Sequence, residues 1–220
     1  MEKDIISYLK GFVTTNRSKL FEKIIANRTR YITVAIEDVY QPHNASAVLR
    51  TCDCFGIHDV HIIENKNKYE VNPDVALGAD KWLNMIKYNS NKENTLSAIR
   101  NIKNLGYRIV ATTPHNNAVM LEDFDIHKGK FALLFGTELN GLSQNAIDAA
   151  DEFLKIPMYG FTESFNISVS AAIILHHLSH KLRNFNTLWE LTQNEQKEIM
   201  IQWLINSIKN GEKIAQNFTE

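Results

Sequence analysis

The chain has 220 residues and a mass of 25.2 kDa, which is the size of one domain with short extensions. Hydrophobic residues make up 44% and charged residues 22%, a balance that excludes a disordered, collagen-like or disulfide-scaffold protein. No apolar run is long enough to span a bilayer, and the N-terminal sequence lacks the basic and apolar regions of a signal peptide. We therefore expect a cytoplasmic protein with no membrane contact.

The net charge of −1 is unevenly distributed along the chain. Residues 1–30 contain seven basic and three acidic residues, whereas residues 31–180 contain twelve basic and seventeen acidic residues. A basic N-terminal arm on an acidic body is typical of a protein that binds a polyanion. The alternative is a solvated surface helix with ordinary lysines.

Taken in chain order, the sequence begins with an amphipathic helical pattern over residues 4–27. Short apolar runs then alternate with helical patterns, and this alternation predicts an α/β fold. The run at 131–135 is continuously apolar, as in a parallel strand that is covered on both faces. The expected strands are 31–36, 60–63, 107–111, 131–135 and 153–156, and the expected helices are 44–55, 94–105, 143–150, 168–183 and 195–209.

Several common functional motifs are missing from the sequence. It contains neither the glycine pattern of a dinucleotide-binding turn nor a P-loop. The eight histidines do not form a metal-binding His-Glu-x-x-His helix, so we expect no metal site. Cys52 and Cys54 are too few and too close in sequence for a disulfide framework, and we expect both to be reduced core residues.

A first cluster, at residues 42–56, directly follows the first expected strand. Asn44 is placed as an N-cap, and Ser46 and Arg50 share one face of the helix. On local grounds this is also the pattern of a capped surface helix in which Arg50 pairs with Asp53.

Two further clusters follow later strands. Residues 134–143 place Gly136 and Glu138 in a loop after a buried strand, although Glu138 could instead be a carboxylate at the approach to a helix. Residues 156–172 place Ser164, Asn166 and Ser168 at the start of an apolar helix, where any of them could be a cap. All three clusters occupy the edge where the carboxyl ends of parallel strands meet, which is where ligands bind in such sheets.

Together these segments resemble the signature motifs of the SpoU/TrmH family of RNA 2′-O-ribose methyltransferases in the SPOUT superfamily. The matching stretches are N-x-S-A-x-x-R-T-C-D-x-x-G, L-F-G-x-E-x-x-G-x-S and I-P-M-x-G-x-x-x-S-x-N-x-S-V-x-A-A, in the family's order. The resemblance covers about residues 30–183. The 30-residue arm, the segment 78–82 and a C-terminal helix with Trp203 are similar to the tRNA-modifying subgroup.

The resemblance implies a trefoil-knotted parallel sheet with helices on both faces and short helical extensions at both ends. It divides the chain into an arm (1–30), a methyltransferase domain (31–183) and a C-terminal extension (184–220), and it implies a homodimer. It also implies S-adenosylmethionine as the cofactor. The implied catalytic residues are Asn44, Arg50, Glu138, Ser164 and Asn166. The implied cofactor-binding residues are Thr112, Thr113, Gly136, Ile156, Met158, Ser164 and Phe165.

The implied reaction is methyl transfer to a ribose 2′-hydroxyl of tRNA, at guanosine 18 in the D-loop. Ribosomal RNA or another tRNA position is an alternative, and an RNA-binding module that has lost catalysis is another. A guanidinium stays charged at neutral pH, so we interpret Arg50 as a cation that holds phosphate and stabilises a developing alkoxide. We expect RNA contacts from Arg17, Arg28, Arg30, Lys181 and Arg183.

Overall fold

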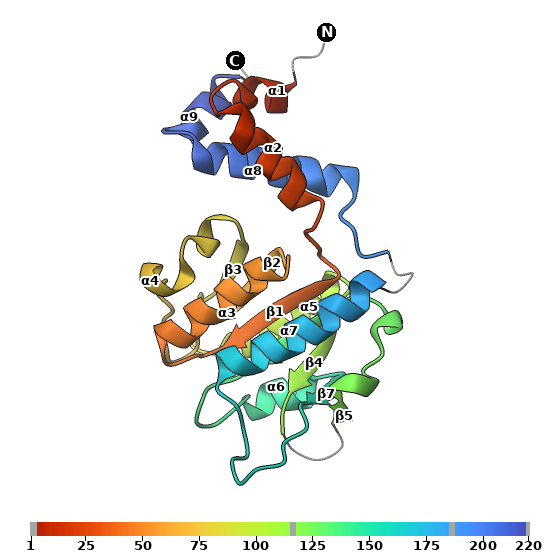
Figure 1. Cartoon of the computed structure of the whole chain (residues 1–220). Coiled ribbons are helices and arrows are strands. Elements are labelled where there is room, and N and C mark those ends of the chain that lie inside the picture. The colour runs from red at the N-terminus through yellow and green to blue at the C-terminus, as the bar shows by residue number, and fades with distance from the viewer. Residues whose placement is uncertain (1–3, 115–117, 185–187, 219–220) are drawn as a thin grey trace. The chain divides into compact units, whose positions relative to one another are not determined.

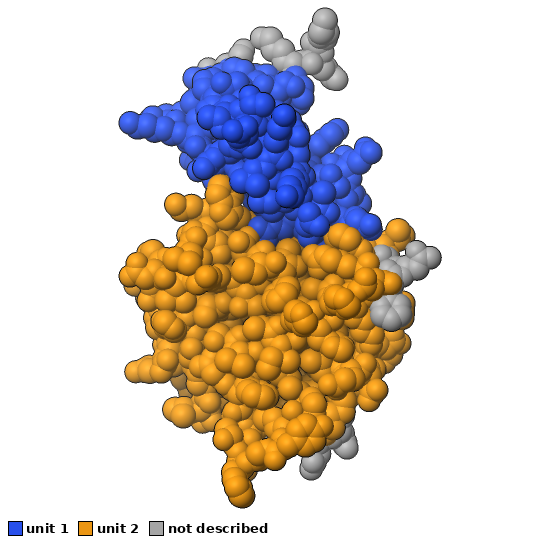
Figure 2. Space-filling view, in the orientation of Figure 1, with its two compact units in different colours: residues 1–29, 190–220 blue, residues 30–189 orange. Residues whose placement is uncertain are grey.

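The computed structural model describes residues 4–114, 118–184 and 188–218. The chain forms two compact units, which Figure 2 shows in different colours. Unit 1 contains residues 1–29 and 190–220, and unit 2 contains residues 30–189. Among the described residues, no helix has both the length and the apolar character needed to cross a membrane.

Unit 2 is built on a seven-stranded sheet in the order β3-β2-β1-β6-β4-β7-β5, and every recorded strand pair is parallel. Strands β1 and β6 lie at the centre and are buried along their whole length, as their β-branched and aromatic residues predict. The strands are β1 (Ile32–Glu37), β2 (Asp59–Ile63), β3 (Asn84–Tyr88), β4 (Arg108–Thr112), β5 (Val119–Met120), β6 (Phe131–Phe135) and β7 (Glu152–Lys155).

Helices cover both faces of the sheet (Figure 1). On one face α3 (Pro42–Cys54) and α7 (Ile167–Asn184) pack side by side on the larger apolar core. On the other face α5 (Thr95–Asn104) and α6 (Gln144–Ala149) cover a smaller core. Short elements complete the unit: α4 (Pro73–Ala76), η1 (Ala79–Lys81), η2 (Leu121–Asp123) and η3 (Ile126–Lys128).

The five expected strands are confirmed, with ends that differ by one residue at most. The sequence analysis missed β3 and β5. Strand β3 lies at one edge of the sheet and is partly exposed, so its residues Asn84–Tyr88 lack a continuous apolar pattern. Strand β5 has two residues and no pattern to detect.

Unit 1 combines both ends of the chain in a helical unit. Its helices are α1 (Ile5–Lys10), α2 (Thr15–Ile25), α8 (Gln193–Ser207) and α9 (Gly211–Gln216). Trp203 is buried at its centre, where its ring packs edge-on against Phe21. The two chain segments also meet in an antiparallel bridge between Thr29 and Glu190.

Two expectations for this unit and its neighbour were wrong. The single helix expected over residues 4–27 is two helices, because Gly11 ends α1 and the Thr14 side chain caps α2 at Arg17 N. Cys52 is buried as expected, but Cys54 is exposed, since it lies on the outer side of α3.

Candidate active site

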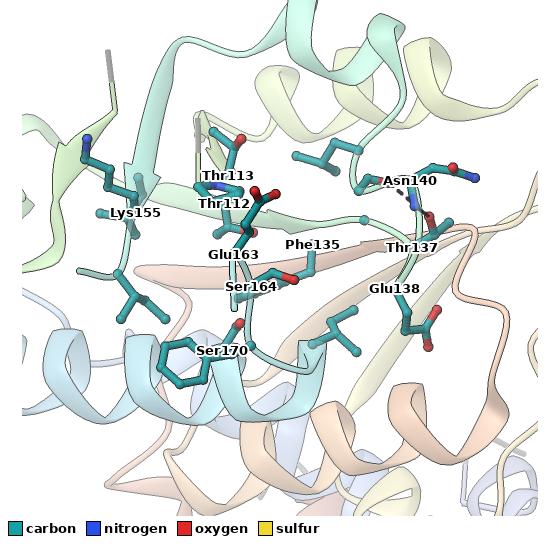
Figure 3. Close-up of a pocket in the computed structure, with 18 of the residues that line it drawn as sticks. Thr112, Thr113, Phe135, Thr137, Glu138, Asn140, Lys155, Glu163, Ser164 and Ser170 are labelled. Atoms are coloured by element: carbon teal, nitrogen blue, oxygen red, sulfur yellow. Dashed lines mark hydrogen bonds between the residues drawn. The ribbon is translucent and has the colours of Figure 1, made fainter. Parts of the chain in front are cut away.

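A pocket of about 660 Å³ opens beyond the carboxyl ends of β4, β6 and β7. These three strands are neighbours in the order β6-β4-β7, so the loops that follow them meet at one place although they are far apart in sequence. In Figure 3, Thr112 lies at the end of β4, Glu138 lies on the loop after β6, and Ser164 lies between them in this view. This is the edge at which ligands bind in parallel sheets.

All seven residues implied to bind a cofactor line this pocket: Thr112, Thr113, Gly136, Ile156, Met158, Ser164 and Phe165. The Thr112 hydroxyl donates to Leu134 O at 2.7 Å, which ties β4 to β6 at the pocket. Sequence reasoning missed two charged residues of the lining, Lys155 and Glu163. The only sequence feature that could have indicated them is that each precedes an implied cofactor-binding residue, Ile156 or Ser164.

Residues 136–143 are here called the glycine loop, and residues 136–142 of this loop form one wall of the pocket. At Gly136 a Cβ atom would lie 2.2 Å from the carbonyl carbon of Gly141, so only glycine allows the two ends of the loop to cross. Gly141 has a φ of 66°, and Thr137 and Gly141 exchange two backbone hydrogen bonds of 2.9 and 3.0 Å. These contacts close the loop tightly between Thr137 and Gly141.

Three clusters of the sequence meet in a hydrogen-bonded network of Asn44, Glu138 and Asn166. The Asn44 Nδ2 group donates to Glu138 Oε1 at 2.7 Å, and the Asn166 Nδ2 group donates to Asn44 Oδ1 at 3.1 Å. Asn44 is 5% exposed, whereas Asn166 is exposed, so both bonds are partly buried. We call these three side chains the Asn–Glu–Asn network.

The structure changes the expected helix-cap role of Asn44 and confirms the one considered for Asn166. Asn44 is not the N-cap of its helix, because α3 begins at Pro42 after Gln41 and Asn44 lies in the first turn. Asn166 does cap α7, since its Oδ1 atom accepts hydrogen bonds from Ser168 N at 2.8 Å and Ser168 Oγ at 2.6 Å. Its Nδ2 group remains available for Asn44, so capping and the network are compatible.

Arg50 lies exposed on α3, the helix that also carries Asn44. Among the described residues it forms no recorded hydrogen bond or ion pair, so the expected alternative of a pair with Asp53 is not present. Arg50 does not line the pocket. Ser46, one turn earlier, is buried and bonded to the Tyr69 hydroxyl at 2.9 Å, so it serves packing.

The two candidate RNA-binding residues of unit 1 differ in exposure. Arg17 is exposed on α2. Arg28 is 2% exposed, and its guanidinium lies 5.2 Å from the centre of the Trp203 ring. Such a cation–π contact stabilises the unit and does not leave Arg28 at the surface for a phosphate.

The other three candidates, in unit 2, are engaged in contacts within the unit. Arg30 Nε lies 3.1 Å from the Asp59 carboxylate. Lys181 Nζ donates to Phe124 O at 2.8 Å, and Arg183 donates to Phe55 O at 3.0 Å. Burial lowers the pKa of Arg183 from its ordinary value. These contacts assign structural roles to all three side chains.

No group of three or more His, Cys, Asp or Glu side chains that could hold a metal ion occurs in the described part of the chain. The polar groups that the site does contain are those of the pocket, the Asn–Glu–Asn network and Arg50. Amides, a carboxylate and a guanidinium can orient a sugar and a phosphate through hydrogen bonds.

Comparison with known proteins gives a family match over residues 31–176, to the model described as the SpoU rRNA Methylase family. The chain belongs to the SpoU methylase family. The matched residues include all three clusters and the strands that carry them.

Individual relatives support this assignment. The tRNA (guanosine(18)-2′-O)-methyltransferase of Borreliella burgdorferi is 41% identical over 213 residues, which are 96% of this chain and 95% of that protein. The crystal structure of a TrmH/SpoU tRNA modifying enzyme from A. aeolicus has 28% identity and a TM-score of 0.78, covering 88% of this chain and 98% of that chain.

A third relative shows how widely the fold is shared. The SpoU methyltransferase AviRb from Streptomyces viridochromogenes, solved in complex with AdoMet, has 21% identity and a TM-score of 0.59. The match covers 74% of this chain and 62% of that chain. The seven-stranded parallel sheet with helices on both faces is thus the SpoU fold, as expected. The trefoil knot stays a prediction of the resemblance.

Proposed function

We propose that this protein transfers a methyl group from S-adenosylmethionine to the ribose 2′-hydroxyl of guanosine 18 in the D-loop of tRNA. The relative named for this reaction matches almost the whole chain at 41% identity. The observation that carries the proposal is the Asn–Glu–Asn network, which joins all three sequence clusters beside the pocket.

The pocket suits S-adenosylmethionine in its chemistry as well as its position. Ile156, Met158 and Phe165 provide apolar walls that fit an adenine ring. Thr112, Thr113 and Ser164 add polar groups that could fix the orientation of the ribose and the amino acid part. The bound cofactor supplies an activated methyl group on a sulfonium, so the chain itself has to provide orientation and charge stabilisation.

Arg50 has the properties required to act on the RNA. A 2′-hydroxyl is a poor nucleophile until its oxygen is polarised or deprotonated. The exposed guanidinium of Arg50 can hold the adjacent phosphate in a bidentate contact and stabilise negative charge on the oxygen. We assign proton removal to no single residue, because a guanidinium is almost never neutral.

The remaining catalytic candidates position these groups. Glu138 fixes Asn44 through the 2.7 Å hydrogen bond, and Asn44 in turn accepts from Asn166. The Oδ1 atom of Asn166 also caps α7, which gives this side chain a second set of contacts. We propose that Ser164, which lies on the same loop and lines the pocket, contacts the cofactor or the target ribose.

We further propose that the protein acts as a homodimer in the cytoplasm, where tRNA is modified. The family resemblance supports the dimer, and the exposure of Arg50 is compatible with a site that a second subunit completes. Analytical ultracentrifugation of the purified protein tests the oligomeric state.

Methylation of tRNA from a strain that lacks the gene tests the function. Purified protein and S-adenosylmethionine should introduce one 2′-O-methyl group, which mass spectrometry of nuclease fragments should locate at guanosine 18. An equal reaction with a transcript in which guanosine 18 is replaced by adenosine would contradict the assignment. Methylation of ribosomal RNA alone would favour the alternative substrate, and no transfer to any RNA would favour a binding module.

A further inference from the structure

Glu37 is a buried carboxylate next to the pocket that the mechanism above does not use. It is the last residue of β1 and is 2% exposed. Three donors surround it: the Ser143 backbone N–H at 2.8 Å, the Ser143 hydroxyl at 2.6 Å and the Thr95 hydroxyl at 2.5 Å. Among the described residues no basic side chain forms an ion pair with it.

A carboxylate in such a place is stable only if its oxygens are hydrogen-bonded, because burial of an unpaired charge is costly. Hydrogen bonds to a charged acceptor are also the stronger ones. Glu37 therefore joins three elements firmly: the end of β1, the first residue of α5 and Ser143, the N-cap of α6. Ser143 is also the last residue of the glycine loop.

The glycine loop is thus fixed at both ends. At its start it continues from β6, and Gly136 is pressed against Gly141 and Leu142. At its end the contacts of Ser143 with Glu37 determine where the backbone leaves the pocket wall. Between these points the loop has a single recorded side-chain contact with another cluster, the bond from Asn44 to Glu138.

We propose that Glu37 is a positioning residue that holds the glycine loop in the conformation that binds the methyl donor. The inference rests on the proposed function, since it assigns the cofactor to the pocket that this loop lines. Glu37 does not touch the cofactor. Its effect is transmitted through Ser143 to the backbone of the loop.

A matched pair of variants separates this role from general stabilisation. Ser143→Ala and Thr95→Val each remove one hydroxyl that donates to Glu37, but only Ser143 belongs to the glycine loop. Isothermal titration calorimetry with S-adenosylhomocysteine should give a dissociation constant raised at least fivefold for Ser143→Ala. Thr95→Val should remain within twofold of the wild type, although both variants lose thermal stability.

A second pair tests the carboxylate itself. Glu37→Gln removes the charge, and Glu64→Gln makes the same change in a buried carboxylate that follows the neighbouring strand β2. Glu64 accepts from Tyr69 N at 3.2 Å and Asn89 Nδ2 at 3.3 Å, outside the glycine loop. Amide hydrogen exchange without cofactor should become at least tenfold faster in residues 136–143 of Glu37→Gln and stay unchanged there in Glu64→Gln.

The outcomes are distinct. Wild-type cofactor affinity and unchanged exchange of residues 136–143 in both Glu37→Gln and Ser143→Ala would overturn the inference. Equal loss of affinity in Ser143→Ala and Thr95→Val would also overturn it, because the effect would then be one of general stability. If the wild type binds no cofactor, the proposed function fails, whereas the exchange measurement still tests whether Glu37 holds the loop.

Discussion

Arg50 is the residue on which catalysis is expected to depend most. Its side chain is exposed on α3 and has no recorded partner among the described residues, so it is available for RNA. Arg50→Lys keeps the charge but loses the planar fork that binds phosphate in two places. We expect turnover to fall at least about 100-fold, with cofactor affinity unchanged.

Arg100→Lys provides the control for this change, because Arg100 is an exposed arginine on α5, on the opposite face of the sheet. Steady-state methyl transfer with saturating tRNA measures both variants. Near-normal turnover in Arg50→Lys would show that Arg50 has no part in the reaction.

His61 is expected to make the stability of unit 2 depend on pH. It is fully buried on β2, its Nδ1 atom lies 2.9 Å from the Tyr88 hydroxyl, and burial lowers its pKa from 6.5 to about 4. Below pH 6.5 the His61 side chain is protonated in the unfolded chain, but in the folded chain it stays neutral until about pH 4. The free energy of unfolding therefore falls as the pH is lowered through this interval.

The size of this effect follows from the shift in pKa. Each unit corresponds to about 1.4 kcal/mol, so the loss from this group between pH 7 and pH 5 is about 2 kcal/mol. Urea unfolding at both pH values measures it in the wild type and in His61→Asn, which cannot titrate. The same decrease in both proteins would mean that other groups cause the acid sensitivity.

At the level of single elements, the glycine loop shows the strongest steric requirement. A Cβ atom at Gly136 would lie 2.2 Å from Gly141 C, so Gly136→Ala has to displace the loop. Overpacking of this kind costs about 1–3 kcal/mol, and we expect cofactor affinity to fall at least about tenfold. Gly160→Ala adds the same methyl group where the nearest atom is 4.0 Å away, so its cofactor affinity should stay nearly unchanged in the same titration.

The central strands are the elements that a continuous apolar pattern predicted. Strands β1 and β6 are buried on both faces, and such runs have few alternative structures. The partly exposed edge strand β3 and the break between α1 and α2 depend on tertiary contacts and local caps, which periodicity does not reveal.

The candidate site likewise contains some features that the sequence predicted and others that it did not. The family resemblance indicated seven residues that line the pocket, and the order of the parallel strands explains why their loops meet there. They did not indicate that Asn44 lies inside its helix or that Glu37 holds Ser143, since both depend on contacts between distant segments. The distribution of charge along the sequence likewise did not indicate that Arg28 is buried against Trp203.

For the whole molecule, the structure changes which charges are expected to bind RNA. Unit 1 contains nine basic and eight acidic residues, because residues 190–220 contribute acidic side chains next to the basic arm. The arm therefore does not act as a simple basic patch. Its exposed cations on α2, namely Arg17, Lys19 and Lys23, are the best candidates for phosphate contacts.

Replacing these three side chains by glutamine should weaken tRNA binding and flatten its salt dependence. With fewer phosphate contacts, binding releases fewer counterions from the RNA. The slope of log Kd against log salt concentration should fall by about 2–3 if all three contact phosphate. The control replaces Lys66, Lys68 and Lys92 by glutamine, which removes the same charge from exposed positions of unit 2. Filter binding at several salt concentrations measures both proteins, and equal slopes would mean that the net charge of the protein, rather than α2, governs its affinity for RNA.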